Sequence, residues 1–272
     1  MDVVQSTVQA MTRLGFGGQD LCARVLARAG WRVSARSVGR YRRKRPIEPP
    51  TPPEEAPAAR ATKPVSARFV HHVWMMDVSE VKQLLGPALH VAAVLDACSR
   101  APLALQVFQT RPTAPDMARL LRAAARAFTR PKYLITDLGG EFTGGAFKKA
   151  VRRLGTVQRF AARESIKATA RLERFWRTLK EAAGLYRLHL PLTASDLESR
   201  LELALVHYLC FRPHEGLEGA VPAEVFLGLE PAHLSAVEPP RGRPGEGPTE
   251  PPFQIEYLDP RNRRFPVLKR AA

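Results

Sequence analysis

A proline-rich segment constrains the fold of this 272-residue chain more than any other feature of its sequence. Seven prolines lie between Pro46 and Pro64. Because proline lacks a backbone N–H donor and restricts φ, such a segment cannot form the interior of a helix or a sheet. We therefore expect residues 46–67 to form an extended, semi-rigid linker that separates two domains.

The segment before this linker is strongly basic. Residues 1–45 contain ten Lys and Arg residues and only two Asp. Apolar residues recur at helical spacing between Leu21 and Ala29, Gly30 ends that helix, and Ser34 can cap a second one. Two helices joined by a short turn, with a basic second helix, have the outline of a helix-turn-helix that binds the major groove of DNA. The alternative is a basic two-helix appendage whose charges are only solvated.

The charge of the whole chain favours a polyanionic partner. Its 42 basic and 26 acidic residues leave a formal net charge of +16. Nucleic acid is the natural candidate, because Lys and Arg side chains that bind its closely spaced phosphates release counterions, which favours binding. The apolar runs are far shorter than the roughly 18 residues of a membrane span, and the N-terminus lacks a signal-peptide pattern. We expect no membrane attachment.

The cysteines and the adjacent histidines predict neither a disulfide framework nor a zinc site. Cys22, Cys98 and Cys210 are widely spaced and form no CxxC pair, which is typical of buried thiols in a reducing compartment. His71 and His72 are neighbours on a predicted strand and would point to opposite faces, so they would not chelate one ion.

The central part of the chain alternates strand and helix patterns. Apolar runs with strand character cover residues 73–81, 89–96, 103–110, 133–137 and 157–161, and helical spacing covers residues 114–128, 147–154, 168–183 and 195–208. The first three strands follow one another through short turns, and helices separate the later ones. This order predicts an α/β fold with a mixed sheet.

Three acids in this part of the chain have the chemistry of a metal site. Asp77 and Asp137 each follow an apolar run, and Glu173 lies in an amphipathic basic helix. Hard divalent cations prefer oxygen ligands, and two such ions can stabilise both the attacking and the leaving oxygen of a phosphodiester. Each acid also has a structural interpretation, since Asp before Gly is common in turns and Glu173 can pair with Arg177 one turn later.

Five motifs occur in order between residues 68 and 228. They are Trp74-x-x-Asp77, Leu95-Asp96-x-x-Ser99-Arg100, Thr136-Asp137-x-Gly139-x-Glu141-Phe142, the run from Leu172 to Lys180, and Tyr208 to His214 with Leu217, Gly219 and Pro222. The interval between Asp137 and Glu173 is 35 residues. These features resemble the Asp, Asp, 35 residues, Glu pattern of DDE transposases and retroviral-type integrases, in particular bacterial insertion-sequence transposases.

The resemblance implies a fold, a reaction and partners. The fold is a ribonuclease H-like core in which the first and fourth strands are adjacent and bring Asp77 and Asp137 together. Asp77, Asp137 and Glu173 would bind two Mg²⁺ ions, with Mn²⁺ as a substitute, and catalyse DNA end cleavage and strand transfer. The protein would act as a homo-oligomer on double-stranded DNA, at element ends and target, in the bacterial cytoplasm and associated with the nucleoid.

Two other functions stay open from the sequence. One is a catalytically inactive or domesticated DNA-binding relative, which would not need all three acids. The other is a ribonuclease H-like nuclease without strand transfer. The presence of all three acids argues against the first, and the basic N-terminal helices and the Arg212-Pro213-His214 segment favour the transposase over the second.

The motifs and the charge pattern also predict DNA contacts and supporting acids. The predicted DNA-binding residues are Arg36, Arg40, Arg42, Arg43, Lys167, Arg177, Lys180, Arg212 and His214. Asp96 is interpreted as a structural acid that bonds Ser99 or Arg100, and Glu141 as a turn residue or a residue that supports the metal ligands. The segment Lys167–Ala170 and Leu209 depart from the family pattern without touching a predicted metal ligand.

The C-terminal part of the chain predicts a second linker and a hairpin. Residues 229–252 are rich in Pro and Gly, and residues 253–272 alternate apolar and polar residues around Asp259-Pro260-Arg261-Asn262. A lone hairpin is marginal in water, so we expect it to dock on another surface. The predicted organisation is a helix-turn-helix (1–45), a linker (46–67), a catalytic core (68–228), a linker (229–252) and a β-hairpin tail (253–272).

Overall fold

The computed structural model describes residues 3–14, 16–42, 66–83, 86–161, 166–185, 192–239 and 253–270. The chain divides into two compact units, one formed by Ala59–Cys210 and the other by Met1–Ala58 together with Phe211–Ala272. Most of the predicted first linker and residues 240–252 of the second lie outside the described residues. The boundaries of the five predicted segments stay predictions.

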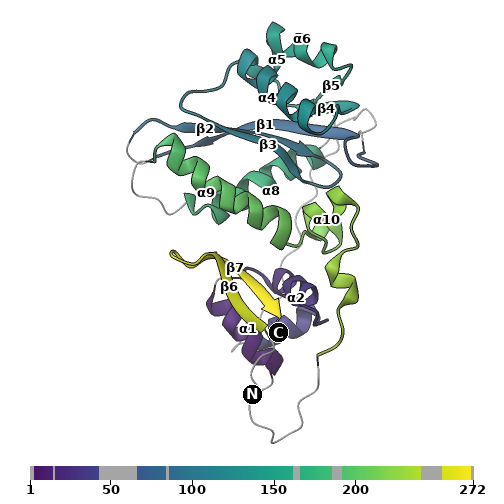
Figure 1. Cartoon of the computed structure of the whole chain (residues 1–272), viewed down its shortest axis with the longest axis vertical. Helices are drawn as coiled ribbons and strands as arrows, with labels where there is room; N and C mark the ends of the chain where they lie inside the picture. Colours follow the sequence, from purple (N-terminus) through teal and green to yellow (C-terminus); the bar gives the residue numbers. More distant parts are fainter. Residues whose placement is uncertain are drawn as a thin grey trace, which may run out of the picture. The chain divides into compact units, whose positions relative to one another are not determined.

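The unit formed by Ala59–Cys210, the core unit, contains a five-stranded mixed sheet (Figure 1). Its strands stand in the order β3-β2-β1-β4-β5 and comprise β1 (Val73–Val81), β2 (Leu89–Asp96), β3 (Pro102–Phe108), β4 (Tyr133–Thr136) and β5 (Val157–Phe160). Strands β1, β2 and β3 are antiparallel neighbours, while β4 is parallel to both β1 and β5. The predicted mixed α/β sheet is confirmed.

The register of β1 against β4 determines where the acids lie. Val73 pairs with Tyr133 and Met75 pairs with Ile135, so the two strands are offset by a constant 60 residues. Continuing that register places Asp77 at the level of Asp137, just beyond the last paired residues. The adjacency of the first and fourth strands that the resemblance implied is confirmed.

Helices cover both faces of the sheet (Figure 1). One face carries α4 (Ala114–Ala127), α5 (Gly140–Thr143) and α6 (Gly145–Arg153), and the other carries α8 (Ile166–Ala182) and α9 (Ala194–Val206). Residues 73–76 of β1 are all buried, as expected for a strand between two helical layers. The N-cap of α9 is Thr193, whose Oγ1 accepts from Asp196 N at 3.1 Å, so the helix begins just before the predicted range of 195–208.

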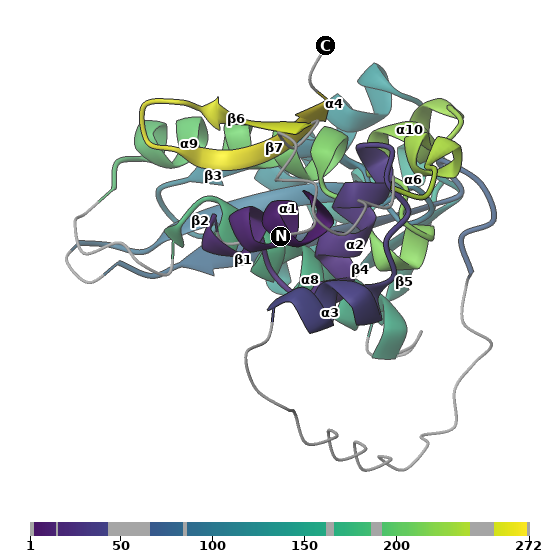
Figure 2. The ribbon, with the colours of Figure 1, turned by 90° about the horizontal axis from the view of Figure 1, so that it is seen from below.

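The second unit, the terminal unit, combines residues from the N-terminal and the C-terminal parts of the chain (Figure 2). It contains α1 (Val3–Arg13), α2 (Gln19–Arg28), α3 (Ala35–Arg42), a 3₁₀ turn (Glu215–Leu217), α10 (Pro222–Leu227), a second 3₁₀ turn (Ala232–Ser235), β6 (Phe253–Asp259) and β7 (Arg264–Arg270). A short π-helical turn (His207–Phe211) spans the position in the sequence where the core unit ends and the second segment of the terminal unit begins. The two helices predicted before the linker are present, but the sequence reasoning missed α1, although Val4, Val8 and Met11 have helical spacing and are buried.

The C-terminal hairpin packs against the N-terminal helices. Phe253 belongs to the buried apolar cluster of α1, α2 and α3, and Leu268 packs against that cluster. The ring of Phe253 meets Trp31 edge to face, with centroids 4.6 Å apart. The expectation that the hairpin docks is therefore confirmed, and its docking surface is the other end of the same chain.

The described residues include no helix with the length and apolarity that crossing a bilayer requires.

Candidate active site

Asp77 is a largely buried acid with few hydrogen-bond donors. It lies in the middle of β1, at the point where pairing with β4 stops. Its Oδ1 accepts from the Val78 backbone N–H and its Oδ2 accepts from the Trp176 indole of α8, each at 2.9 Å. Burial raises the pKa of Asp77 to about 6, against the lowering effect of those two bonds, and Asp137 and Glu141 raise it further. Burial therefore disfavours the ionised form of Asp77 more than its two hydrogen bonds stabilise it.

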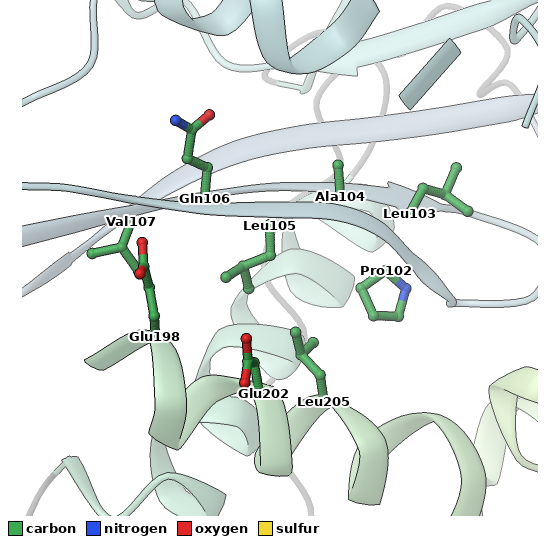
Figure 3. Close-up of a pocket in the computed structure, with 9 residues that line it drawn as sticks. All are labelled: Pro102, Leu103, Ala104, Leu105, Gln106, Val107, Glu198, Glu202 and Leu205. Carbon is green, nitrogen blue, oxygen red and sulfur yellow. The ribbon is translucent and has the colours of Figure 1, made fainter. Parts of the chain in front are cut away.

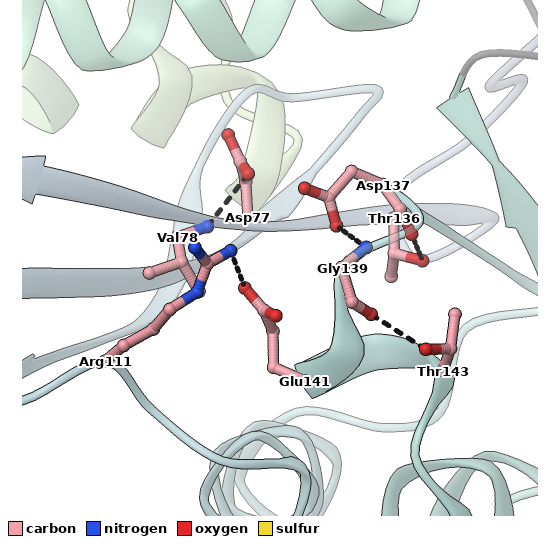
Figure 4. Close-up of polar contacts among 8 residues, drawn as sticks. All are labelled: Asp77, Val78, Arg111, Thr136, Asp137, Gly139, Glu141 and Thr143. Atoms are coloured by element: carbon pink, nitrogen blue, oxygen red, sulfur yellow. Dashed lines mark hydrogen bonds and ion pairs between the residues drawn. The ribbon is translucent and has the colours of Figure 1, made fainter.

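Asp137 and Glu141 approach each other beside Gly139 (Figure 4). Asp137 directly follows β4, is exposed, and accepts from the Gly139 backbone N–H through Oδ1 at 2.9 Å. A Cβ atom at Gly139 would lie 2.6 Å from Glu141 Oε2 and 3.0 Å from Asp137 Oδ1. A side chain there would displace the end of the Glu141 side chain.

Glu141 is a buried acid that the sequence placed only in a supporting role. Its side chain is 4% exposed and forms an ion pair with Arg111, Nη2 to Oε1, at 2.9 Å. Arg111 lies in the loop between β3 and α4 and was not singled out from the sequence, because no motif contains it. Only the folded sheet brings it to Glu141.

Helix α8 contacts β1 and carries Glu173. Trp176 bonds Asp77, and Lys180 Nζ donates to the Glu80 carbonyl at 2.7 Å. Glu173 is exposed, one turn before Trp176. Within the described part of the chain, no three His, Cys, Asp or Glu side chains are grouped closely enough to hold a metal ion. Asp137 and Glu141 thus lie close enough to Asp77 to raise its pKa, whereas Glu173 lies near the helix turn that contacts β1.

Asp96 has the structural role that was predicted for it. Its side chain is fully buried and Oδ1 accepts from Cys98 N, Ser99 N and Ser99 Oγ, at 3.0, 2.7 and 2.8 Å. Oδ2 accepts from His71 N at 2.7 Å. The carboxylate closes the turn after β2 and holds the segment before β1.

The predicted DNA contacts of the terminal unit differ in exposure. Arg36 and Arg40 are exposed on α3, and Arg40 lies over the ring of Tyr41. Arg42 instead turns inward and donates to the Phe16 carbonyl at 3.4 Å. Arg212 is half-buried, and the His214 backbone N–H donates to the Ala220 carbonyl at 3.0 Å. Arg43 lies outside the described residues.

The predicted DNA contacts of the core unit lie on α8. Arg177 is exposed, whereas Lys180 is half-buried and burial lowers the pKa of its ammonium group. The side chain of Lys167 lies outside what the structure describes. These assignments stay predictions.

A pocket of about 350 Å³ lies elsewhere in the core unit, between β3 and α9 (Figure 3). Its described lining combines the edge strand, residues 102–107, with Glu198, Glu202 and Leu205. That lining contains none of the acids described above.

Residues 68–165 match the family model of the integrase core domain. This part of the chain is a DDE integrase/transposase-like domain. Together with the strand order β3-β2-β1-β4-β5, the match identifies a ribonuclease H-like core. The matched range includes Asp77 and Asp137 and ends before Glu173.

Several solved structures are similar to the integrase-like domain. The catalytic core of BIV integrase is 22% identical, over 58% of this chain and 95% of that chain, with a TM-score of 0.46. The HTLV-2 integrase catalytic core in complex with magnesium (dimeric form) is 17% identical, over 58% and 98%, with a TM-score of 0.46. A simian T-cell lymphotropic virus intasome in complex with PP2A regulatory subunit B56 gamma is 15% identical, over 76% and 73%, with a TM-score of 0.48. No curated protein matches the chain.

Proposed function

We propose that this protein is a transposase or integrase that cleaves DNA ends and joins them to target DNA with the help of divalent metal ions. The observation that carries the proposal is the state of Asp77. This carboxyl group is largely buried, lies level with Asp137 in the β1–β4 register, and has its pKa raised to about 6 by burial first and by Asp137 and Glu141 in addition. Such a group is stabilised in its ionised form by a cation.

The donor set suits magnesium. Asp77 and Asp137 offer carboxylate oxygens, the ligands that hard divalent cations prefer, and their mutual repulsion would be relieved by a bound ion. We assign Asp77, Asp137 and Glu173 as the ligands of two Mg²⁺ ions, for which Mn²⁺ would substitute. When bound, the ions would neutralise charge on the phosphodiester and lower the pKa of the attacking hydroxyl or water.

The rest of the chain would hold the DNA. The bonds of Trp176 and Lys180 to β1 keep the α8 turn that carries Glu173 beside the strand of Asp77. Exposed Arg177 on α8, and Arg36 and Arg40 on α3, would contact phosphates of the element ends and of the target. Because two DNA ends must be held together for joining, the active form would be a homo-oligomer on DNA.

One assay separates this function from its alternatives. The full chain is incubated with magnesium and a labelled duplex taken from the DNA that flanks the coding region. Joined products are expected. Cleavage without joining would instead indicate a nuclease, and binding without either reaction would indicate an inactive DNA-binding relative.

The role of Glu173 needs its own variant. We expect Glu173→Gln to lower joining and cleavage by at least about 100-fold, as loss of a metal-site residue does, and to leave DNA affinity nearly unchanged. Glu181→Gln is the matched control, because Glu181 is exposed on the same helix. Equal turnover in the two variants would remove Glu173 from the site.

A further inference from the structure

Arg111 is an exposed arginine with a buried partner. Its side chain is 66% exposed, yet it forms its ion pair with Glu141, whose side chain is 4% exposed. The two residues come from different parts of the fold, the loop before α4 and the short helix α5 after β4. The pair therefore fixes a solvent-facing guanidinium against the core of the domain.

Arg111 lies beside Asp77, Asp137 and Glu141, the three residues that we call the acidic site. Glu141 raises the pKa of the Arg111 guanidinium most, and Asp137 and Glu80 raise it further, so the cation faces acids of both β1 and the turn after β4. Figure 4 shows Glu141 between Arg111 and the turn that carries Asp137 and Gly139, with Asp77 on the neighbouring strand. The buried carboxylate of Glu141 also acts on Asp77.

Arg119 shows what an ordinary ion pair of this domain looks like. Its side chain is 67% exposed, almost the same as Arg111, and its partner Asp116 lies three residues earlier in the same helix. Asp116 also bonds Thr113 at the N-cap of α4, so that pair belongs to the start of one helix. Arg111 differs in having a partner that is buried and adjacent to Asp137.

The charge balance of the site supplies a reason for this arrangement. Asp77, Asp137 and Glu141 would repel a DNA phosphate, and a protein cation beside them would reduce that repulsion in addition to the metal ions. A guanidinium has five N–H donors in a planar fork that matches phosphate oxygens, and the bond to Glu141 uses one of them.

We propose that Arg111 binds a phosphate of the DNA strand at the acidic site, and that Glu141 is the positioning residue that holds its guanidinium there. This inference rests on the proposed function and adds a catalytic residue outside the five motifs. It also assigns Gly139 a purpose, because the space at that glycine allows Glu141 to reach Arg111 while Asp137 keeps its place.

The test compares Arg111→Ala with Arg119→Ala in the full chain, using the same flanking duplex and magnesium. We expect Arg111→Ala to lower cleavage and joining by about 100-fold, the usual cost of losing one group that stabilises transition-state charge. The slope of log affinity against log salt should also fall by about 1, because one phosphate contact is lost. Arg119→Ala should change neither quantity.

Two further variants keep the test valid if Arg111→Ala unfolds because Glu141 is left unpaired. Arg111→Ala combined with Glu141→Gln removes both charges, and should restore the thermal midpoint but not the salt slope or the activity. Glu141→Gln alone should keep the slope while lowering kcat, since the cation remains but loses its orientation. A merely structural ion pair would move only the thermal midpoint.

The outcomes are separable. If the wild-type chain neither cleaves nor joins DNA, the proposed function fails, and the salt slope alone then decides for or against Arg111. If the wild type is active and Arg111→Ala, or the double variant, matches Arg119→Ala in activity and slope, the assignment of Arg111 is overturned.

Discussion

Asp77 and Asp96 stand on neighbouring strands of one sheet in opposite surroundings. Both follow apolar runs in the sequence, and both are largely removed from water. Asp96 accepts four hydrogen bonds from the turn that follows it and from His71, whereas Asp77 accepts from its neighbour Val78 and from one distant indole.

The difference shows how a fold separates structural acids from functional ones. A carboxylate whose oxygens meet local N–H and O–H donors is stabilised in its ionised form and closes a turn. A carboxylate with few donors and other acids nearby retains an excess of negative charge that only a proton or a cation can offset. Four substitutions and pH changes test this contrast.

The largest effect is expected on the reaction itself. Asp77→Asn should lower DNA cleavage and joining by about 10⁴-fold, equivalent to about 5 kcal/mol of transition-state stabilisation, because an amide cannot replace a charged metal ligand. The fold should persist, as measured by circular dichroism and thermal unfolding. Retention of activity in this variant would place the chemistry elsewhere.

Next in size is the loss of stability when Asp96 is removed. Asp96→Ala should lower the free energy of unfolding by about 4 kcal/mol, because the buried donor at Ser99 and the partly buried donors at His71 and Cys98 would lose their acceptor. Ser99→Ala, which removes a single donor, should cost about 1 kcal/mol. Urea unfolding measures both losses of stability. An Asp96→Ala protein as stable as wild type would contradict the structural role that distinguishes Asp96 from Asp77.

The pH dependence of stability should differ between wild type and Asp77→Asn. The pKa of Asp77 is raised from 3.8 to about 6, so the folded state binds the proton more tightly than the unfolded state. The stabilisation from this proton is complete below about pH 4 and is lost as pH rises through about 6; it amounts to about 3 kcal/mol. Unfolding free energies in a chelator should show this decline for wild type only. A parallel decline in both proteins would contradict the assignment.

The smallest effect is expected from the indole that contacts Asp77. The Trp176 bond lowers the pKa of Asp77, so Trp176→Phe should move that pKa further upward and shift the acidic limb of the activity profile to higher pH. The accompanying loss of stability should be only about 1 kcal/mol. An unchanged pH profile would show that the hydrogen bond does not influence the carboxylate.

The sequence alone determined the order of the elements and the structural acid. Strand runs, helical spacing and turn residues are local patterns, so they predicted the five strands, the helices that flank them and the C-terminal hairpin close to where they lie. The bonds of Asp96 to Ser99 were also predictable, because both residues belong to one turn. Helix α1 was within reach of the same reasoning, but its spacing was overlooked.

Only the tertiary structure decided which side chains surround the predicted acids. Trp176 and Asp77 are 99 residues apart in sequence and Arg111 and Glu141 are 30 apart, so their contacts depend on how α8 docks and where the β3–α4 loop turns. The packing of Phe253 on Trp31 joins the two ends of the chain in the same way. Local periodicity specifies which face of an element is apolar, but the partner of each side chain follows from register and docking, which long-range packing determines.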